Sequence, residues 1–243
     1  MTRVALALLV LLLPAPAWAE AKDAPAIWES EPGGFEGFVG VVCNSLGQAR
    51  EYGFWGLSQD TDKAAWWYGQ AAVWLKASAD KGFPIAQHVL GTLYNTGKGV
   101  PLDYDQAIYW YTQAAENGRP WAYYNLGQVY ARREDQTPDY QKAWTMFHKA
   151  AVLGSAEDRW VVGWRYAIDT GMPPDFVEAY AWLRVSEAQA RAGLAGRPDL
   201  EKQAASGLQF VTSKLSPADL ARAQARAKEY YQKYVVEVGA ADD

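Results

Sequence analysis

The middle of the chain repeats with a period of 36 residues. When residues 85–120, 121–156 and 157–192 are aligned without a gap, the same kinds of side chain recur at the same positions. The aligned sets include Leu90, Leu126 and Val162; Gly91, Gly127 and Gly163; Tyr94, Tyr130 and Tyr166; and Asp103, Asp139 and Asp175. A fixed period of this length is typical of a solenoid, in which each unit buries its apolar face against its neighbours.

Each unit has the pattern of two helices. In residues 85–120 the first helical face holds Ala86, Leu90, Gly91 and Tyr94, and the second holds Ala107, Trp110, Ala114 and Ala115. A glycine inside a helix costs about 1 kcal/mol relative to alanine, so a recurring one implies close packing. We therefore expect Gly91 to be the socket for Trp110 or Tyr94.

The turn between the two helices is the sequence GKGVP at 97–101. Its glycines permit a sharp reversal, and Pro101 discourages helix before Asp103. Asp103 is placed to cap the second helix, and Gly118 is placed to end it.

These residues resemble the consensus of the Sel-one-like repeat, a relative of the tetratricopeptide repeat. The match runs from Ala86 through GKGVP to Gly118, covers about 85–193 well and covers 46–84 partly. The resemblance implies an all-α fold, an α/α superhelical solenoid that acts as an adaptor. In bacteria such proteins are often periplasmic and serve signalling, envelope assembly or secretion.

The solenoid is predicted to cover 46–193, with units at about 46–84, 85–120, 121–156 and 157–193. Residues 194–243 are expected to form capping helices, because Ser216 and Pro217 give a helix start after an apolar helical face. Residues 20–45 contain several prolines and glycines and are predicted to be an irregular N-terminal arm.

Residues 1–19 have the features of a secretory signal peptide. Arg3 precedes an apolar run from Val4 to Leu13, and a small-x-small site ends at Ala19. The run is too short to span a bilayer, which needs about 20 helical residues. We expect an exported protein, periplasmic or secreted, with no stable membrane insertion after cleavage.

Composition and single residues exclude several classes of function. A net charge of -5 and a pI near 5.2 disfavour nucleic acid as a partner. Cys43, the single cysteine, cannot form an intramolecular disulfide and is expected to be buried as a small apolar residue. The two histidines, His88 and His148, lie in different units, and no G-x-S-x-G string occurs. We expect no catalytic residues, no metal site, no cofactor and no enzyme activity.

The chain is rich in aromatic residues, with Trp 12, Tyr 15 and Phe 7. If the first helix of each unit lines the concave side, four large rings converge there, with two polar neighbours. The candidate partner-binding residues are Trp121, Tyr124, Gln128, Trp160, Trp164 and His88. The rings have two interpretations: packing between units, or a groove that anchors a partner.

Two functions remain open. The first is a protein–protein interaction scaffold or regulatory adaptor of the bacterial envelope, which binds another envelope protein on the concave aromatic face. The alternative is a glycan-binding module for peptidoglycan or an exported polysaccharide, which a ladder of aromatic rings also suits.

The cleavage site gives a direct test of export. Material secreted by a bacterial host is expected to begin at Glu20, because the small-x-small site ends at Ala19. N-terminal sequencing of the periplasmic fraction measures this. A full-length chain retained in the cytoplasm would contradict the prediction.

Overall fold

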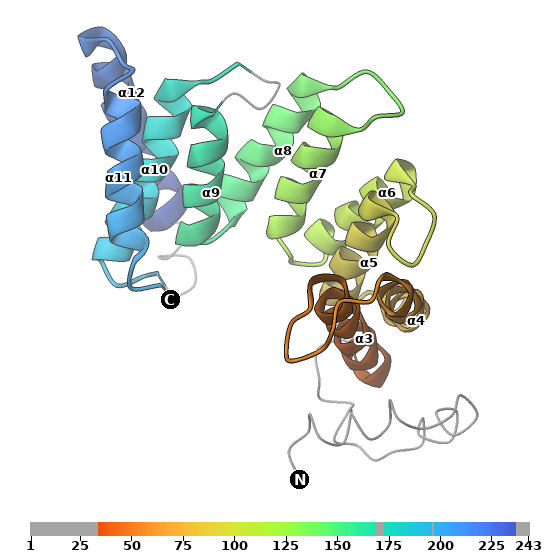
Figure 1. Cartoon of the computed structure of the whole chain (residues 1–243). Helices are drawn as coiled ribbons and strands as arrows, with labels where there is room; N and C mark the ends of the chain where they lie inside the picture. The colour runs from red at the N-terminus through yellow and green to blue at the C-terminus, as the bar shows by residue number, and fades with distance from the viewer. Residues whose placement is uncertain (1–33, 169–172, 196, 237–243) are drawn as a thin grey trace. The chain divides into compact units, whose positions relative to one another are not determined.

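The computed structural model of the chain describes residues 34–168, 173–195 and 197–236, and it divides into two compact units, 1–119 and 120–243 (Figure 1). All regular structure in the described residues is helical, so the predicted all-α fold class is confirmed. The predicted signal peptide at 1–19, its cleavage site and the first part of the arm lie outside the described residues.

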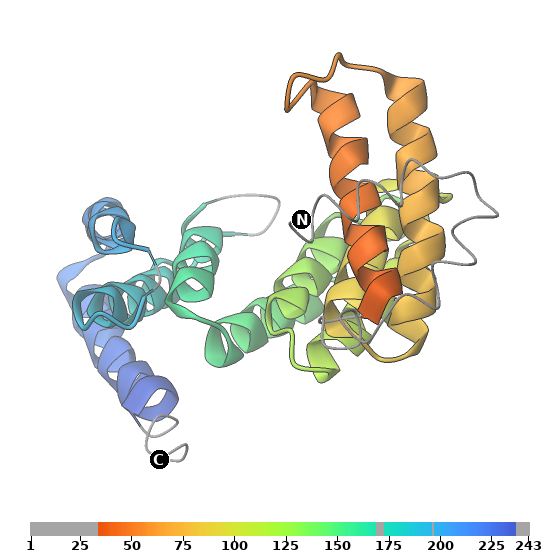
Figure 2. The ribbon, with the colours of Figure 1, turned by 90° about the horizontal axis from the view of Figure 1, so that it is seen from below.

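The first unit contains two helix pairs. Its helices are α3 (Gly34–Tyr52), α4 (Thr61–Asp80), α5 (Pro84–Thr96) and α6 (Tyr104–Glu116). Helix α3 packs along α4, α4 packs on α5, and α5 pairs with α6. The long α3–α4 pair is seen side by side in Figure 2.

The second unit contains two further helix pairs and the C-terminal helices. Its helices are α7 (Trp121–Arg132), α8 (Tyr140–Leu153), α9 (Ala156–Ala167), α10 (Phe176–Arg191), α11 (Leu200–Thr212) and α12 (Pro217–Tyr231). A short π-helical turn, Gln232–Val236, follows α12. Helix α7 pairs with α8 and α9 with α10, while α11 and α12 both pack on α10.

Helix α3 corrects the prediction of an irregular arm over 20–45, because residues 34–45 are helical. Its glycines are contact positions rather than breaks in the helix. A Cβ on Gly47 would lie 2.7 Å from Cδ1 of Tyr68, and one on Gly40 would lie 2.6 Å from Cγ of Leu75. Close packing of α3 on α4 offsets the helical cost of these glycines, which local sequence alone does not reveal.

The aspartate that recurs every 36 residues joins the two helices of its unit. Asp103 accepts a hydrogen bond from Gln106 N at 2.9 Å, as Asp139 does from Lys142 N. In each unit the aspartate N–H also donates to the carbonyl of the repeat tyrosine on the preceding helix, for example Asp103 N to Tyr94 O at 3.0 Å. One residue therefore caps the second helix and occupies the end of the first.

The recurring helical glycine receives a large side chain from the second helix of its own unit. Gly91 faces Tyr111, with 2.8 Å from an added Cβ to Cδ1, so the expectation of Trp110 or Tyr94 is wrong. The same contact recurs 36 and 72 residues later as Gly127 with Phe147 and Gly163 with Leu183. The predicted face of the second helix is buried as expected, but Tyr111, next to Trp110, is buried as well and is the residue that meets the glycine.

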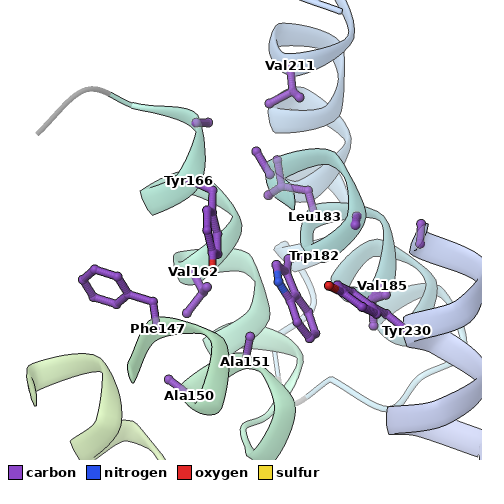
Figure 3. Close-up of a cluster of buried hydrophobic side chains, with 14 of the residues drawn as sticks. Phe147, Ala150, Ala151, Val162, Tyr166, Trp182, Leu183, Val185, Val211 and Tyr230 are labelled. Carbon is purple, nitrogen blue, oxygen red and sulfur yellow. The ribbon is translucent and has the colours of Figure 1, made fainter. Parts of the chain in front are cut away.

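The core of the second unit joins the repeats to the C-terminal helices (Figure 3). Trp182 of α10 stacks on Tyr230 of α12, with ring centroids 4.4 Å apart. In the first unit Cys43 is fully buried, as expected, and burial raises the pKa of its thiol to about 12. The thiol is therefore protonated and unreactive at neutral pH.

Two glycine substitutions test the contact between the helical glycine and the large side chain of the second helix. Gly127→Ala should destabilise the chain by about 1 to 3 kcal/mol, because its Cβ would overlap the ring of Phe147. Gly69→Ala, also inside a helix, should stabilise it by about 0.5 to 1 kcal/mol, because the nearest atom to its Cβ is 3.9 Å away. Urea denaturation of both variants measures the difference. Equal shifts would show that the glycine contact does not hold the pair together.

Candidate functional site

A pocket of about 640 Å³ lies between α7, α9 and α11 of the second unit. It is lined by Tyr124, Gln128, Arg132, Trp160, Val161, Trp164, Arg165, Ile168, Gln203 and Ser206. The residues from α7 are spaced four apart, and those from α9 recur at four-residue steps, so each helix presents one face. The pocket is therefore a product of the helical repeat and not of a loop.

Four of the six predicted residues line this pocket: Tyr124, Gln128, Trp160 and Trp164. Trp121 is not in the lining but stacks on Tyr124, with ring centroids 4.3 Å apart and an interplanar angle of 17°. This stacking restricts the movement of the Tyr124 ring.

His88 lies in the first unit and packs there against Tyr111, with ring centroids 5.7 Å apart. Burial, with a smaller contribution from Arg119, lowers the pKa of its imidazole to about 4. The ring is neutral at physiological pH. The structure places it with core residues of that unit and not in the lining of the pocket.

The tryptophans of the pocket both pack against neighbouring residues and line the pocket, so they fit the packing interpretation and the groove interpretation. Trp164 stacks on Phe210 of α11, with ring centroids 5.7 Å apart, and also lines the pocket. Gly207 leaves room for it, because an added Cβ would lie 3.3 Å from Trp164 Cε2. Trp160 is half-buried, and its Nε1 has no hydrogen-bond partner among the described residues. The rings are held by packing and still present apolar surface to the pocket.

Two arginines that are not among the predicted residues, Arg132 and Arg165, also line the pocket. Arg165 exposes only 4% of its surface, and its guanidinium carbon lies 5.2 Å from the centroid of the Phe147 ring. Its Nε and Nη2 have no hydrogen-bond partner in the described part of the chain. Burial and, to a lesser extent, the charge of Arg132 lower the pKa of Arg165.

The repeat register contains the signal that reveals Arg165. At 36-residue steps Arg165 aligns with Leu93 and Val129, both fully buried apolar residues. A charged residue at a core position is the kind of local conflict that marks functional sites in natural proteins. No aspartate or glutamate lines the pocket, so its charge is positive in a chain whose net charge is negative.

The described ranges contain neither of two other kinds of site, a metal centre and a membrane span. No group of three or more metal-ligating side chains was found there. No described helix is long and apolar enough to cross a membrane.

The family model of the Sel1 repeat matches residues 41–72, 84–118, 122–155 and 160–190, which is more than half of the chain. The chain belongs to the Sel1 repeat family. The four matched segments follow the helix pairs α3–α4, α5–α6, α7–α8 and α9–α10. A search of the curated proteins returned no match.

Solved structures with detectable similarity share little sequence with the chain. A Sel1 repeat protein from Oxalobacter formigenes is 21% identical, with a TM-score of 0.44, over 82% of this chain and 99% of that one. A protective antigen of uropathogenic Escherichia coli with an SLR fold is also 21% identical, with a TM-score of 0.39, over 83% of this chain and 55% of that one. An immunity protein from Pseudomonas aeruginosa is 16% identical, with a TM-score of 0.27, over 69% of this chain and 78% of that one.

The buried imidazole of His88 makes the stability of the chain depend on pH. Because the folded-state pKa is about 4 and the unfolded value is about 6.5, the unfolded chain binds the proton first as pH falls. This contribution to stability is complete above pH 6.5 and is lost as pH falls towards 4. His88→Phe should therefore show a flatter decline in melting temperature over this range than the parent chain. Parallel declines would show that His88 is not held neutral.

Proposed function

We propose that the chain is an exported interaction scaffold or regulatory adaptor of the bacterial envelope, which binds a partner protein in the pocket between α7, α9 and α11. Membership of the Sel1 repeat family supports an interaction role, since the repeat builds a binding surface from paired helices. The sequence features of residues 1–19 support export.

The pocket is the observation that carries this proposal. Its walls combine rigid aromatic rings with a few polar groups, which is the composition of a site that anchors a side chain of a partner. Tyr124 and Trp164 stack on neighbouring rings and Trp160 packs against the core, so binding would cost little loss of side-chain freedom.

A polysaccharide is the alternative ligand. The flat faces of Trp160 and Trp164 also suit a sugar ring, since aromatic rings present large, rigid contact surfaces. The two proposals differ in the ligand that the same tryptophans retain, so one set of variants tests both.

Removal of the two tryptophans should abolish capture of the partner. The variant Trp160→Ala with Trp164→Ala loses most of the apolar lining, and truncation of a central aromatic anchor typically costs about 2 kcal/mol or more of binding energy. Capture from an envelope extract of the source organism is measured for the tagged mature chain. Sedimentation with peptidoglycan and exported polysaccharide is measured in parallel.

The matched control is Trp66→Ala with Tyr109→Ala, which removes two exposed rings of the first unit. It should capture the partner as the parent does. Because Trp164 also packs on Phe210, both double variants are tested well below their melting temperatures. Equal capture by the two double variants would remove the pocket from consideration, and tryptophan-dependent sedimentation without protein capture would favour the glycan ligand.

A further inference from the structure

We propose that the pocket recognises an acidic side chain of the partner protein, with Arg165 as the group that binds its carboxylate. This proposal rests on the proposed function, and it concerns the chemistry of the partner segment that enters the pocket. The segment carries an aspartate or glutamate next to apolar residues.

The first step is the free-energy cost of burying the charged guanidinium of Arg165. Arg165 exposes only 4% of its surface, and its Nε and Nη2 have no hydrogen-bond partner among the described residues. An ion removed from water is costly unless it is paired and hydrogen-bonded. Packing of the guanidinium on Phe147 satisfies none of its N–H donors.

The second step is that the other two buried arginines of the unit have internal acceptors, although Nε of Arg159 has no partner among the described residues. Arg159, on the same helix, donates to Gln189 Oε1 at 2.9 Å and to two backbone carbonyls. Arg133 pairs with Asp135 at 2.7 Å. Structural arginines in this unit are therefore held by internal acceptors, whereas Arg165 belongs to the lining of a pocket that contains no carboxylate.

The third step is the chemistry that fits the pocket. A carboxylate accepts hydrogen bonds from a guanidinium, here from the part of Arg165 that lines the pocket, because its Nε and Nη2 are enclosed by the protein. Arg132 adds a second positive charge in the same lining. That charge already acts on Arg165, since it contributes to the lowered pKa. An anion between the two arginines would relieve their repulsion.

The walls of the pocket select a peptide acid over a small anion. Trp160, Val161 and Trp164 offer apolar contact that a phosphate ion could not use. Gln128 of α7 and Gln203 of α11 bring amide groups from two different helices, and amides both donate to and accept from a peptide backbone. An acidic residue with an apolar neighbour uses all of these groups.

Two dipeptide probes test the proposal. N-acetyl-glutamyl-leucine amide and its glutaminyl counterpart differ only in the charge of one side chain. Each is titrated into the mature chain to millimolar concentrations, and the NMR signals of the Trp160 and Trp164 indole N–H groups and of Arg165 Nε–H are followed. The acidic probe should give saturable shifts, with binding at least about tenfold tighter than that of the neutral probe.

Arg165→Met separates binding from structure. It keeps the apolar stem on Phe147 and removes the charge, so binding of the acidic probe should be lost while the melting temperature stays the same or rises. Arg222→Gln, on α12, removes an exposed arginine that pairs with Asp219 and should leave binding unchanged. A lower melting temperature in Arg165→Met with unchanged binding would show that the arginine is structural and overturn the proposal.

The remaining outcomes also decide the question. Equal shifts of the tryptophan signals by both probes would overturn the role of Arg165 and leave the pocket as a binding site. No shift with either probe would overturn the acidic-peptide inference, while the capture experiment with the tryptophan variants would still test the proposed function. Binding of glucuronate as tight as that of the acidic peptide would show that the site takes an acidic sugar instead.

Discussion

The contact between a helical glycine and a large side chain of the next helix holds each helix pair of this protein together. Gly91 with Tyr111, Gly127 with Phe147 and Gly163 with Leu183 repeat one geometry at 36-residue steps. The most N-terminal pair uses Gly47 with Tyr68 in the same way. In each pair the missing side chain lets the second helix approach until its ring or branched chain lies on the backbone of the first.

The same contacts build the pocket. Leu183 packs on Gly163 of α9 and also on Gly207 of α11, so one side chain fixes both of these helices. Phe147 lies on Gly127 of α7 and carries the guanidinium of Arg165 on its ring. The aromatic and basic groups of the lining are thereby held in position by the residues that form the core, which is the arrangement that favours binding without a large loss of entropy.

The repeat period and the local pattern predict a solenoid of helix pairs and the capping role of Asp103, and the family resemblance implies the all-α fold. Two features depend on contacts that a local pattern does not contain. The glycines of residues 34–47 resemble loop residues until α4 is seen to pack on them. The partner of Gly91 was misassigned because two adjacent aromatic residues, Trp110 and Tyr111, are both buried. Arg165 differs from these two features, because the repeat register already aligns its charge with the apolar residues Leu93 and Val129.

A double-mutant cycle on Gly127 and Phe147 tests the glycine contact most directly. A leucine at position 147 lacks the Cε1 and Cζ atoms that an added Cβ on Gly127 would meet at 2.6 and 2.9 Å. If the overlap causes the loss of stability, Phe147→Leu should partly rescue Gly127→Ala, with a coupling of about 0.5 to 3 kcal/mol in the free energy of unfolding. Additive effects of the two substitutions would contradict the account, because they would show that the two residues do not share the contact on which the helix pairs depend.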